Sequence, residues 1–324
     1  MVNVMREFLV RLTEIISALA VLAALVMTVW HTRPLVELFT NLRPQILLSV
    51  LAVLIVGLAL SSRIGPVAAA LAVLLLAPST LPYVIAQPKP IDTTQPTVRA
   101  LQYNIQFTNL DIDAIAAEVL RADADVVALH EVTDAHWPAL QRSLRGFYPH
   151  VIADPADPEG RAKGQGIALL SRTPLHRISI DTRYPQSPVA ATTEILGAEV
   201  LVLAVHPSPS RTDVWLIEQR ERFLDVSSDV VRAHEGPALI LTDLNVTPTS
   251  PVYGEFLDEL GWDDPRRRFG MEPTYPTGRL NPLGIAIDHI FVSPELTVGD
   301  YELGGSGGSD HRSLTATITT SADH

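Results

Sequence analysis

The sequence predicts an α/β fold in which two packed β-sheets are flanked by helices, preceded by an N-terminal transmembrane helical region. Three observations support this prediction. The first 90 residues hold three long apolar segments, a proline-rich stretch follows, and the rest of the chain alternates strand and helix patterns. Strands outnumber helices, and several follow one another directly, which favours two packed sheets over a single wound sheet.

The apolar segments are residues 12–30, 44–62 and 64–86. Each is close to the ~20 residues that cross a bilayer as a helix. Buried helices of a soluble protein would need a polar face, which these segments lack, and a cleaved signal peptide would account only for the first. We therefore expect residues 1–90 to form a transmembrane region of about three helices. The short link between the second and third segments is equally compatible with a hairpin or a re-entrant pair.

The arginines flanking these segments bear on the orientation in the membrane. They are divided almost evenly between the two sides, so the charge rule discriminates weakly. The pair Arg6 and Arg11 before the first segment favours a cytoplasmic N-terminus. We therefore expect an integral protein of the cell membrane whose second part lies outside the cytoplasm.

Residues 87–97 are rich in proline and threonine, which predicts an extended linker before a domain at 98–324. Residues 1–96 contain six basic and four acidic side chains, whereas the remainder contains 18 basic and 32 acidic ones. This acidic balance disfavours non-specific nucleic-acid binding. The chain has no cysteine, which excludes disulfides, zinc–thiolate sites and a cysteine nucleophile.

The domain pattern predicts two helices and seven strands. Apolar residues recur at helical spacing in 111–121, at Ile112, Ile115, Ala116 and Val119, and a second amphipathic helix is expected at 214–233. The predicted strands are 98–105, 124–132, 166–172, 199–209, 238–245, 285–293 and 313–319.

Polar side chains occur at the end of one predicted strand after another. They are Asn104, His130, Glu131, His206, Asp243, Asn245, Asp288, His289, Asp310 and His311. Strand alternation would place Asp243 and Asn245 on the same side; a cap or a turn is the alternative for any single residue. Burying so many unpaired polar groups would cost about 1–3 kcal/mol each, so we expect eight of them, all but His130 and His289, to converge on a ligand. Oxygen donors without a thiol suit Mg²⁺ or Mn²⁺.

Six short motifs carry a resemblance to a known family. They are YN at 103–104, LHE at 129–131, VHP at 205–207, TDLN at 242–245, IDHI at 287–290 and SDHR at 309–312. In this order they resemble the endonuclease/exonuclease/phosphatase (DNase I-like) superfamily over residues 98–319, and the membrane-anchored bacterial branch is the most similar. The resemblance implies a four-layer α/β sandwich. LHE and TDLN depart from the commoner LQE and GDFN but keep Glu131, Asp243 and Asn245.

The resemblance also implies a metal site and a hydrolytic mechanism. Glu131 would be the principal Mg²⁺ ligand, with Asn104 close by and Asp310 as a further ligand. Asp243 would orient or deprotonate the attacking water, and Asn245 would hold a phosphate oxygen.

Two histidines complete the implied catalytic set. His206 would contact the scissile phosphate, and Asp288 would fix its tautomer. His311, paired with Asp310, would be a second acid, base or charge-stabilising group. In the apurinic-site repair branch a tyrosine typically stands where this chain has His206, so the histidine resembles the DNase I, sphingomyelinase and inositol-phosphatase branches.

These expectations together describe a membrane-anchored, Mg²⁺-dependent phosphoesterase that hydrolyses a phosphodiester by metal-assisted attack of water. Its expected partners are a phosphate-ester substrate and the lipid bilayer. A nuclease acting on DNA or RNA, and a phosphatase acting on phospholipids or inositol phosphates, are the alternatives. A non-catalytic binding module on a membrane anchor is a more remote one, and it would predict the loss of at least one catalytic residue.

Overall fold

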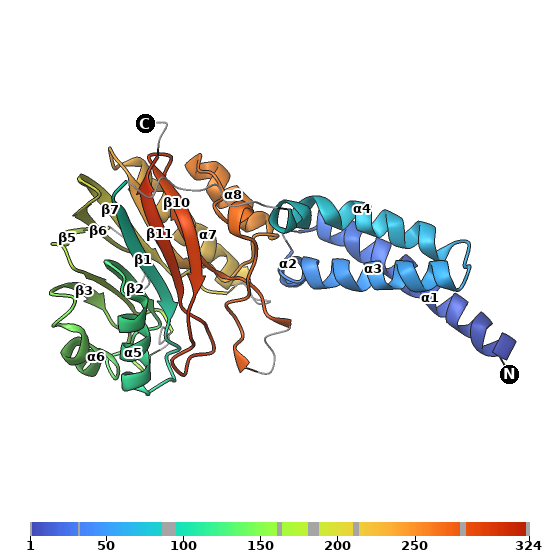
Figure 1. Cartoon of the computed structure of the whole chain (residues 1–324), viewed down its shortest axis with the longest axis horizontal. Coiled ribbons are helices and arrows are strands. Elements are labelled where there is room, and N and C mark those ends of the chain that lie inside the picture. The colour runs from blue at the N-terminus through green and yellow to red at the C-terminus, as the bar shows by residue number, and fades with distance from the viewer. Residues whose placement is uncertain are drawn as a thin grey trace.

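The computed structural model describes residues 2–31, 33–85, 95–160, 164–180, 188–209, 214–278 and 283–321. A helical bundle projects from an α/β body (Figure 1). Most of the predicted linker at 87–97 lies outside the described residues.

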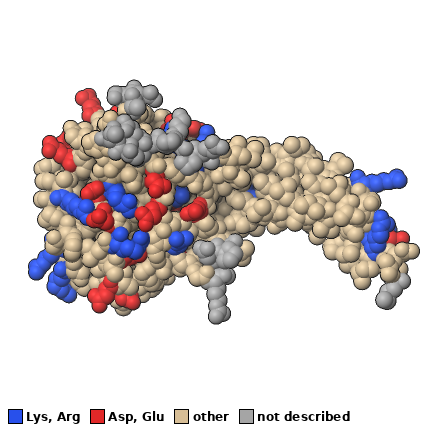
Figure 2. All heavy atoms as spheres, viewed as in Figure 1, with Lys and Arg blue, Asp and Glu red and all other residues tan. Residues whose placement is uncertain are grey.

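The helical bundle is built from apolar helices. It contains α1 (Val2–Val29), α2 (Pro34–Thr40), α3 (Arg43–Ala59) and α4 (Gly65–Val84). In the described part of the chain, α1 and α4 are long and apolar enough to cross a membrane, and α3 is a shorter apolar helix of 17 residues. In the view of Figure 2, charged side chains gather at the free end of the bundle and on the α/β body, with few between.

The bundle differs from the predicted segments at its ends. Helix α1 begins ten residues before the predicted segment 12–30, because the polar residues that precede the segment continue the helix. The short helix α2 was not predicted, since seven residues carry too little periodicity to be recognised.

The α/β body contains two mixed sheets. The six-stranded sheet has the order β10 (Leu296–Leu303), β11 (Leu314–Thr320), β1 (Thr97–Asn104), β2 (Val126–His130), β4 (Ile167–Ser171), β3 (His150–Asp154). The five-stranded sheet has the order β5 (His176–Ile178), β6 (Val189–Ile195), β7 (Ala198–Val205), β8 (Ala238–Asp243), β9 (Asp288–Val292).

The sheets pack face to face with helices outside, as predicted. One apolar cluster lies between the sheets and includes Leu169, Val202 and Leu241. Helices α5 (Ile112–Ala122) and α6 (Trp137–Leu144) cover the outer face of the six-stranded sheet. Helices α7 (Val214–Arg232) and α8 (Pro251–Leu260) cover the outer face of the five-stranded sheet. This is the four-layer α/β sandwich.

Strand direction brings the chemistry-bearing ends to one edge. In each sheet the two central strands, β1 with β2 and β7 with β8, run parallel. Their carboxyl ends therefore leave the sheets on the same side. Strand β9 runs antiparallel to β8 and begins there, with Asp288 opposite Asp243.

All seven predicted strands exist, but four others were missed. Strand β3 has a polar residue at each end, and β5 spans only three residues. Strand β6 has the sequence VAATTEI, and β10 has a register shift between Val298 and Asp300. None of these has the continuous apolar run of the central strands. Strand β9 starts three residues later than predicted, because Ile285 pairs only with Tyr275 in an isolated bridge.

A buried ion pair joins the bundle to the body. The guanidinium of Arg220 in α7 donates two hydrogen bonds to the carboxylate of Glu37 in α2, one of them to Oε2 at 2.9 Å. Arg220 and Glu37 are only 2% and 1% exposed. Neither charge can recover its hydration without separating α2 from α7.

We predict that Glu37→Ala destabilises the full chain by about 3–5 kcal/mol, because the Arg220 charge stays buried without its partner. Glu259→Ala is the matched control. It breaks an exposed ion pair with Arg232, which lies on the same helix as Arg220, and exposed pairs contribute little to stability. Thermal unfolding in detergent compares the two variants. A melting shift for Glu37→Ala no larger than that for Glu259→Ala would contradict the prediction.

Candidate active site

Three polar side chains from three strand ends meet around one amide. Asn104 is the last residue of β1, Glu131 follows β2, and Asp243 is the last residue of β8. The Asn104 amide nitrogen donates to Glu131 Oε1 at 3.0 Å and to Asp243 Oδ2 at 2.9 Å. The structure thus brings together, across both sheets, residues that are 139 positions apart in the chain.

The backbone at Glu131 is unusual. Its φ is +63°, in the left-handed region that a glutamate seldom adopts. Its Oε2 accepts a hydrogen bond from the backbone N–H of Phe107 at 2.9 Å. The next residue, Val132, bonds the backbone of Gly166, where a Cβ would lie 1.7 Å from the Val132 carbonyl oxygen. The close approach of these two backbones requires a glycine and fixes the direction of the Glu131 side chain.

The expectation that Asp243 and Asn245 share one side of a strand is wrong. Strand β8 ends at Asp243, and Asn245 has a φ of +57°. Asp243 Oδ1 instead accepts the backbone N–H of Asn245 at 3.0 Å, and the Asn245 amide donates to the Pro207 carbonyl at 3.0 Å. Asp243 therefore closes a turn with one oxygen and faces the site with the other.

His206 follows β7 and points at the same carboxylates. Its Nε2 lies 3.5 Å from Asp243 Oδ2 and 4.0 Å from Glu131 Oε1. The His206 ring is 5.6 Å from the ring of His130, and both are buried. Among the described residues, His206 Nδ1 has no hydrogen-bond partner.

The predicted pairing of the histidines and acids is wrong in two respects. Asp288 bonds His311, not His206: the distance from His311 Nδ1 to Asp288 Oδ2 is 2.9 Å. Asp310 precedes His311 in the chain, but in the described part of the structure its carboxylate forms no hydrogen bond with the His311 imidazole. The loop presents adjacent side chains in different directions, so the start of β9, rather than the neighbouring residue, reaches the imidazole. His311 Nε2 then lies 3.7 Å from Asp243 Oδ2.

Mutual charge sets the protonation of this group. Burial opposes a charged imidazole, but the charges of Asp288 and Asp243 outweigh it and raise the pKa of His311 to about 10. Burial alone would raise the pKa of Asp288, yet the His311 charge and hydrogen bonds lower it. The remaining acid, Asp243, has its pKa raised by burial and by the Asp288 charge. The arrangement favours a cationic His311 beside a basic Asp243.

Asp310 lies at the rim, half-buried. Burial raises its pKa, and the charges of Glu131 and Asp288 raise it further, against the opposing effect of His311. The Asp310 carboxylate is thus electrostatically linked to Glu131, as two carboxylates near one cation site would be.

Two sets of donors could hold a metal. Asp243, Asp288 and His311 each offer an atom within 4.8 Å of the others. In the first set, His311 offers a nitrogen, and its Nδ1 is already occupied by the bond to Asp288. The carboxylates of Glu131 and Asp310 offer oxygens, which fit a hard cation such as Mg²⁺ better, and the Asn104 amide lies beside Glu131.

Sequence reasoning missed Gln102, and it assigned no neighbours to two histidines of the motifs, His289 and His130. The Gln102 amide donates to Asp288 Oδ1 at 2.9 Å, and the alternation of Gln102 with Asn104 along β1 could have indicated it. His289 faces the core, where Nε2 lies 2.9 Å from the Val246 carbonyl oxygen. His130 is buried with both ring nitrogens unpartnered among the described residues.

Comparisons with known proteins agree with this fold. A structure of an endonuclease/exonuclease/phosphatase from Beutenbergia cavernae DSM 12333 matches with a TM-score of 0.57 and 20% identity, over 70% of this chain and 72% of that chain. The human Nocturnin catalytic domain matches at 0.53 and 20%, over 74% and 99%. Truncated Caenorhabditis elegans TDP2 matches at 0.52 and 18%, over 69% and 98%. No curated protein matches the chain.

The family model decides the assignment. The model of the Endonuclease/Exonuclease/phosphatase family matches residues 101–311, which is more than half of the chain and includes every site residue described above. Members of this family are hydrolases that act on phosphoester bonds. The chain belongs to the Endonuclease/Exonuclease/phosphatase family.

Proposed function

We propose that the chain is a membrane-anchored, divalent-metal-dependent phosphodiesterase, with Mg²⁺ or Mn²⁺ as the cation. One observation carries the proposal: Asn104, His206 and His311 converge on the buried carboxylate of Asp243, and Glu131 shares the Asn104 amide with it. A structural network of this density would normally pair every member. Here the contacts of both imidazoles with Asp243, at 3.5 Å and 3.7 Å, are longer than good hydrogen bonds, so each Nε2 can bond a substrate oxygen instead.

The metal would be held principally by Glu131, with the Asn104 amide close by and Asp310 at the rim. A divalent cation there would polarise the phosphoryl oxygens and neutralise developing charge. Glu131 is held for this role by its bond to the Phe107 N–H. The Asn104 amide oxygen already accepts the backbone N–H of Gln106 at 2.9 Å, which fixes the orientation of the side chain.

Asp243 would accept the proton of the attacking water. Its raised pKa makes it a stronger base than an exposed aspartate. The bond from the Asn104 amide to Asp243 Oδ2 orients the carboxylate, while Oδ1 is occupied by the turn. Asn245, adjacent to this turn, would hold a phosphate oxygen.

The two histidines would serve the phosphoryl group. His311 is kept cationic by Asp288 and would stabilise negative charge on the phosphate or protonate the leaving group. Gln102 donates to the other oxygen of Asp288 and so keeps that carboxylate aimed at the imidazole. His206 would contact the scissile phosphate from the opposite side of Asp243.

The anchor would be the helical bundle, with helices α1 and α4, and α3 as a shorter element. We keep the orientation expected from Arg6 and Arg11, with the α/β body outside the cytoplasm. A phosphodiester at the bilayer suits a body held at the membrane. The net charge of the domain disfavours nucleic acid, which remains the alternative substrate. Because all the family positions are filled, a non-catalytic binding module has little support.

Activity should require a divalent cation. We expect the full chain to hydrolyse at least one member of a panel of bis-nitrophenyl phosphate, plasmid DNA, sphingomyelin and inositol phosphates with Mg²⁺, and to lose activity with EDTA. Glu131→Gln should raise the Mg²⁺ concentration for half-maximal activity at least tenfold, since it removes the ligand charge. Glu159→Gln, an exposed acid outside the site, is the control. An unchanged Mg²⁺ titration for Glu131→Gln would refute the metal assignment.

Asp288 and His311 should act as one unit. Asp288→Asn and His311→Gln should each lower kcat by about 10²–10⁴, the usual scale for a positioned acid or base. The double variant should be no slower than the slower single variant, because each substitution already disables the pair. Steady-state kinetics of the four proteins measure this. A double loss equal to the product of the single losses would show that the two residues work independently.

The chain should partition into membranes. After cell lysis and an alkaline carbonate wash, the full chain should stay in the membrane pellet, because the apolar surfaces of α1 and α4 need lipid or detergent. A chain beginning at Thr97, which lacks the bundle, should stay in the supernatant. Recovery of the full chain as a soluble monomer without detergent would contradict the anchor.

A further inference from the structure

The β8–α8 loop, residues 244–250, carries Asn245 and begins directly after Asp243. The α/β body contacts it at three points near the site, one of which is the bond from the Asn245 amide to the Pro207 carbonyl described above. Leu244 N donates to the Ile287 carbonyl at 2.9 Å, and the Val246 carbonyl contacts His289 Nε2 at 2.9 Å. The second half of the loop turns away from the body toward the helical bundle.

The bundle binds that second half closely. Five hydrogen bonds connect the bundle to residues 247–249. Two of them end on Asn41, whose Oδ1 accepts the Thr247 backbone N–H at 2.9 Å and the Thr247 hydroxyl at 3.2 Å. Thr249 donates its hydroxyl to the Thr40 carbonyl at 2.8 Å. Asn41 is only 8% exposed and Thr247 only 2%, so water cannot readily replace these bonds.

The other two bonds come from charged and aromatic side chains of the bundle. Arg43 donates to the Thr249 carbonyl at 2.7 Å, and the Tyr83 hydroxyl donates to the Pro248 carbonyl at 3.0 Å. Arg43 also donates to the carbonyl of Met27 at the end of α1, at 2.9 Å. The loop is therefore fastened to the end of α2, to α3 and to α4, and through Arg43 it is linked to α1.

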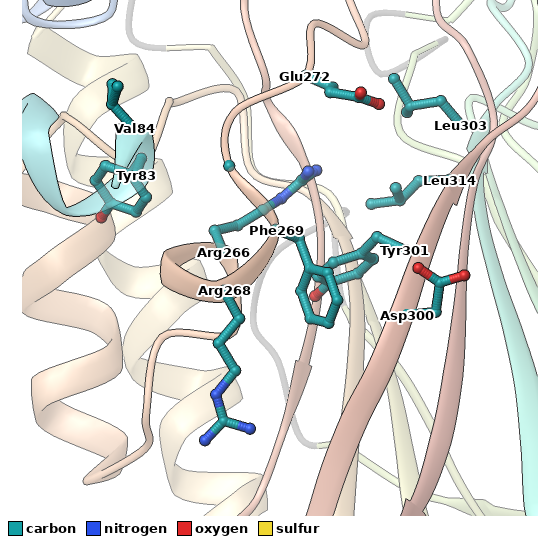
Figure 3. A pocket seen from close by; sticks show the side chains of 11 residues that line it. Tyr83, Val84, Arg266, Arg268, Phe269, Glu272, Asp300, Tyr301, Leu303 and Leu314 are labelled. Atoms are coloured by element: carbon teal, nitrogen blue, oxygen red, sulfur yellow. The ribbon is translucent and has the colours of Figure 1, made fainter. Parts of the chain in front are cut away.

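A second path leads from Tyr83 to Asp288. The Tyr83 hydroxyl also lies 2.7 Å from Asp264 Oδ2, and Asp264 Oδ1 accepts the backbone N–H of Arg266 at 2.9 Å. Arg266 is buried and donates to the Asp288 carbonyl at 2.6 Å. Figure 3 shows Tyr83 at the end of α4 across a cavity of about 360 Å³ from Arg266 and Tyr301.

We propose that the helical bundle positions a loop of the active site. Asn41 is the positioning residue: it holds the β8–α8 loop so that Asp243 and Asn245 face the substrate. The inference rests on the proposed function. The linker at 87–97 already connects the bundle to the body. A bundle that served only as a membrane anchor would need no buried hydrogen bonds to the part of the loop that begins two residues after Asn245. Displacing a catalytic group by about 1 Å can cost 10²-fold in rate.

The test compares three variants in the full chain. Asn41→Ala removes the acceptor for both Thr247 bonds, whereas Asn41→Asp keeps an acceptor oxygen at the same place. Ser62→Ala is the matched control, because it also removes two hydrogen bonds, from Ser62 to Glu14 and from the Gly65 N–H to Ser62. Both lie within the bundle, at the α3–α4 connection, which is at the end away from the body (Figure 1). Should Asn41→Ala not fold, Thr247→Val removes the hydroxyl contacts with Asn41 and Thr249 and keeps the backbone bond to Asn41.

Two readouts are needed. Hydrogen exchange of the peptide covering residues 243–250 should become at least tenfold faster in Asn41→Ala and stay near wild type in Ser62→Ala. The kcat should fall at least tenfold in Asn41→Ala with KM changed less than threefold, and Asn41→Asp should recover most of it. Loss of folded protein would also lower the apparent kcat at constant KM, so kcat is calculated per folded molecule, with the folded fraction of each variant taken from its melting curve.

The outcomes separate the two proposals. Faster exchange with a lower kcat and recovery in Asn41→Asp supports the positioning role. Unchanged exchange, or faster exchange with unchanged kcat, overturns it, as does an equal loss in Ser62→Ala. If the wild-type chain hydrolyses none of the phosphodiesters with Mg²⁺, the proposed function fails, and the exchange result alone then decides whether Asn41 holds the loop.

Discussion

The burial of the Asp243 carboxylate is the constraint on which the site depends. A carboxylate that is 1% exposed needs partners, because its hydration is lost without them. Three partners come from other segments, namely the Asn104 amide and the His206 and His311 imidazoles, and the fourth is the Asn245 backbone N–H in the same turn. Because β1 runs parallel to β2 and β7 runs parallel to β8, these segments end at one edge of the sandwich. The site therefore depends on this strand topology.

The polar partners also divide the site into two electrostatic halves. On one side, Glu131 and Asp310 form an anionic pocket suited to a cation. On the other, Asp288 compensates His311 and leaves a positive imidazole facing Asp243. Asp243 lies between them. Under the proposed function, a phosphodiester would meet a metal beside Glu131 and an imidazolium at His311. The two halves are coupled, because the His311 and Asp288 charges both act on the pKa of Asp310.

The sequence predicted the layers and most of the site because both depend on local patterns. Apolar runs ending in a polar residue mark the central strands, so Asn104, Glu131, His206 and Asp243 could be found without a structure. The pairing of residues could not be predicted, because it depends on three-dimensional direction. Asp310 precedes His311 in the chain, yet Asp288 reaches the imidazole from β9. Asn245 follows Asp243 by two residues, yet a left-handed φ takes it out of the strand. Strands β3, β5 and β10 were missed since edge strands carry little hydrophobic signal. Strand β6 is an inner strand, but its sequence VAATTEI lacks a continuous run of large apolar residues.

The least predictable feature was the contact between bundle and body, since no local pattern in either part refers to the other. Asn41 and Glu37 read as ordinary polar residues between apolar segments, and Thr247 as part of a turn. In space they form a buried polar interface, with the Glu37–Arg220 ion pair on one side and the Asn41–Thr247 bonds on the other. Such an interface fixes orientation, because polar bonds have direction whereas apolar contacts tolerate sliding. With the bundle in a bilayer, as proposed, the start of α3 and the end of α4 lie on the same side as the β8–α8 loop (Figure 1). The site would then lie close to one membrane face, since Thr247, which Asn41 binds, follows Asp243 by only four residues. Under the proposed function, a phosphodiester carried by the bilayer would be the substrate nearest to it.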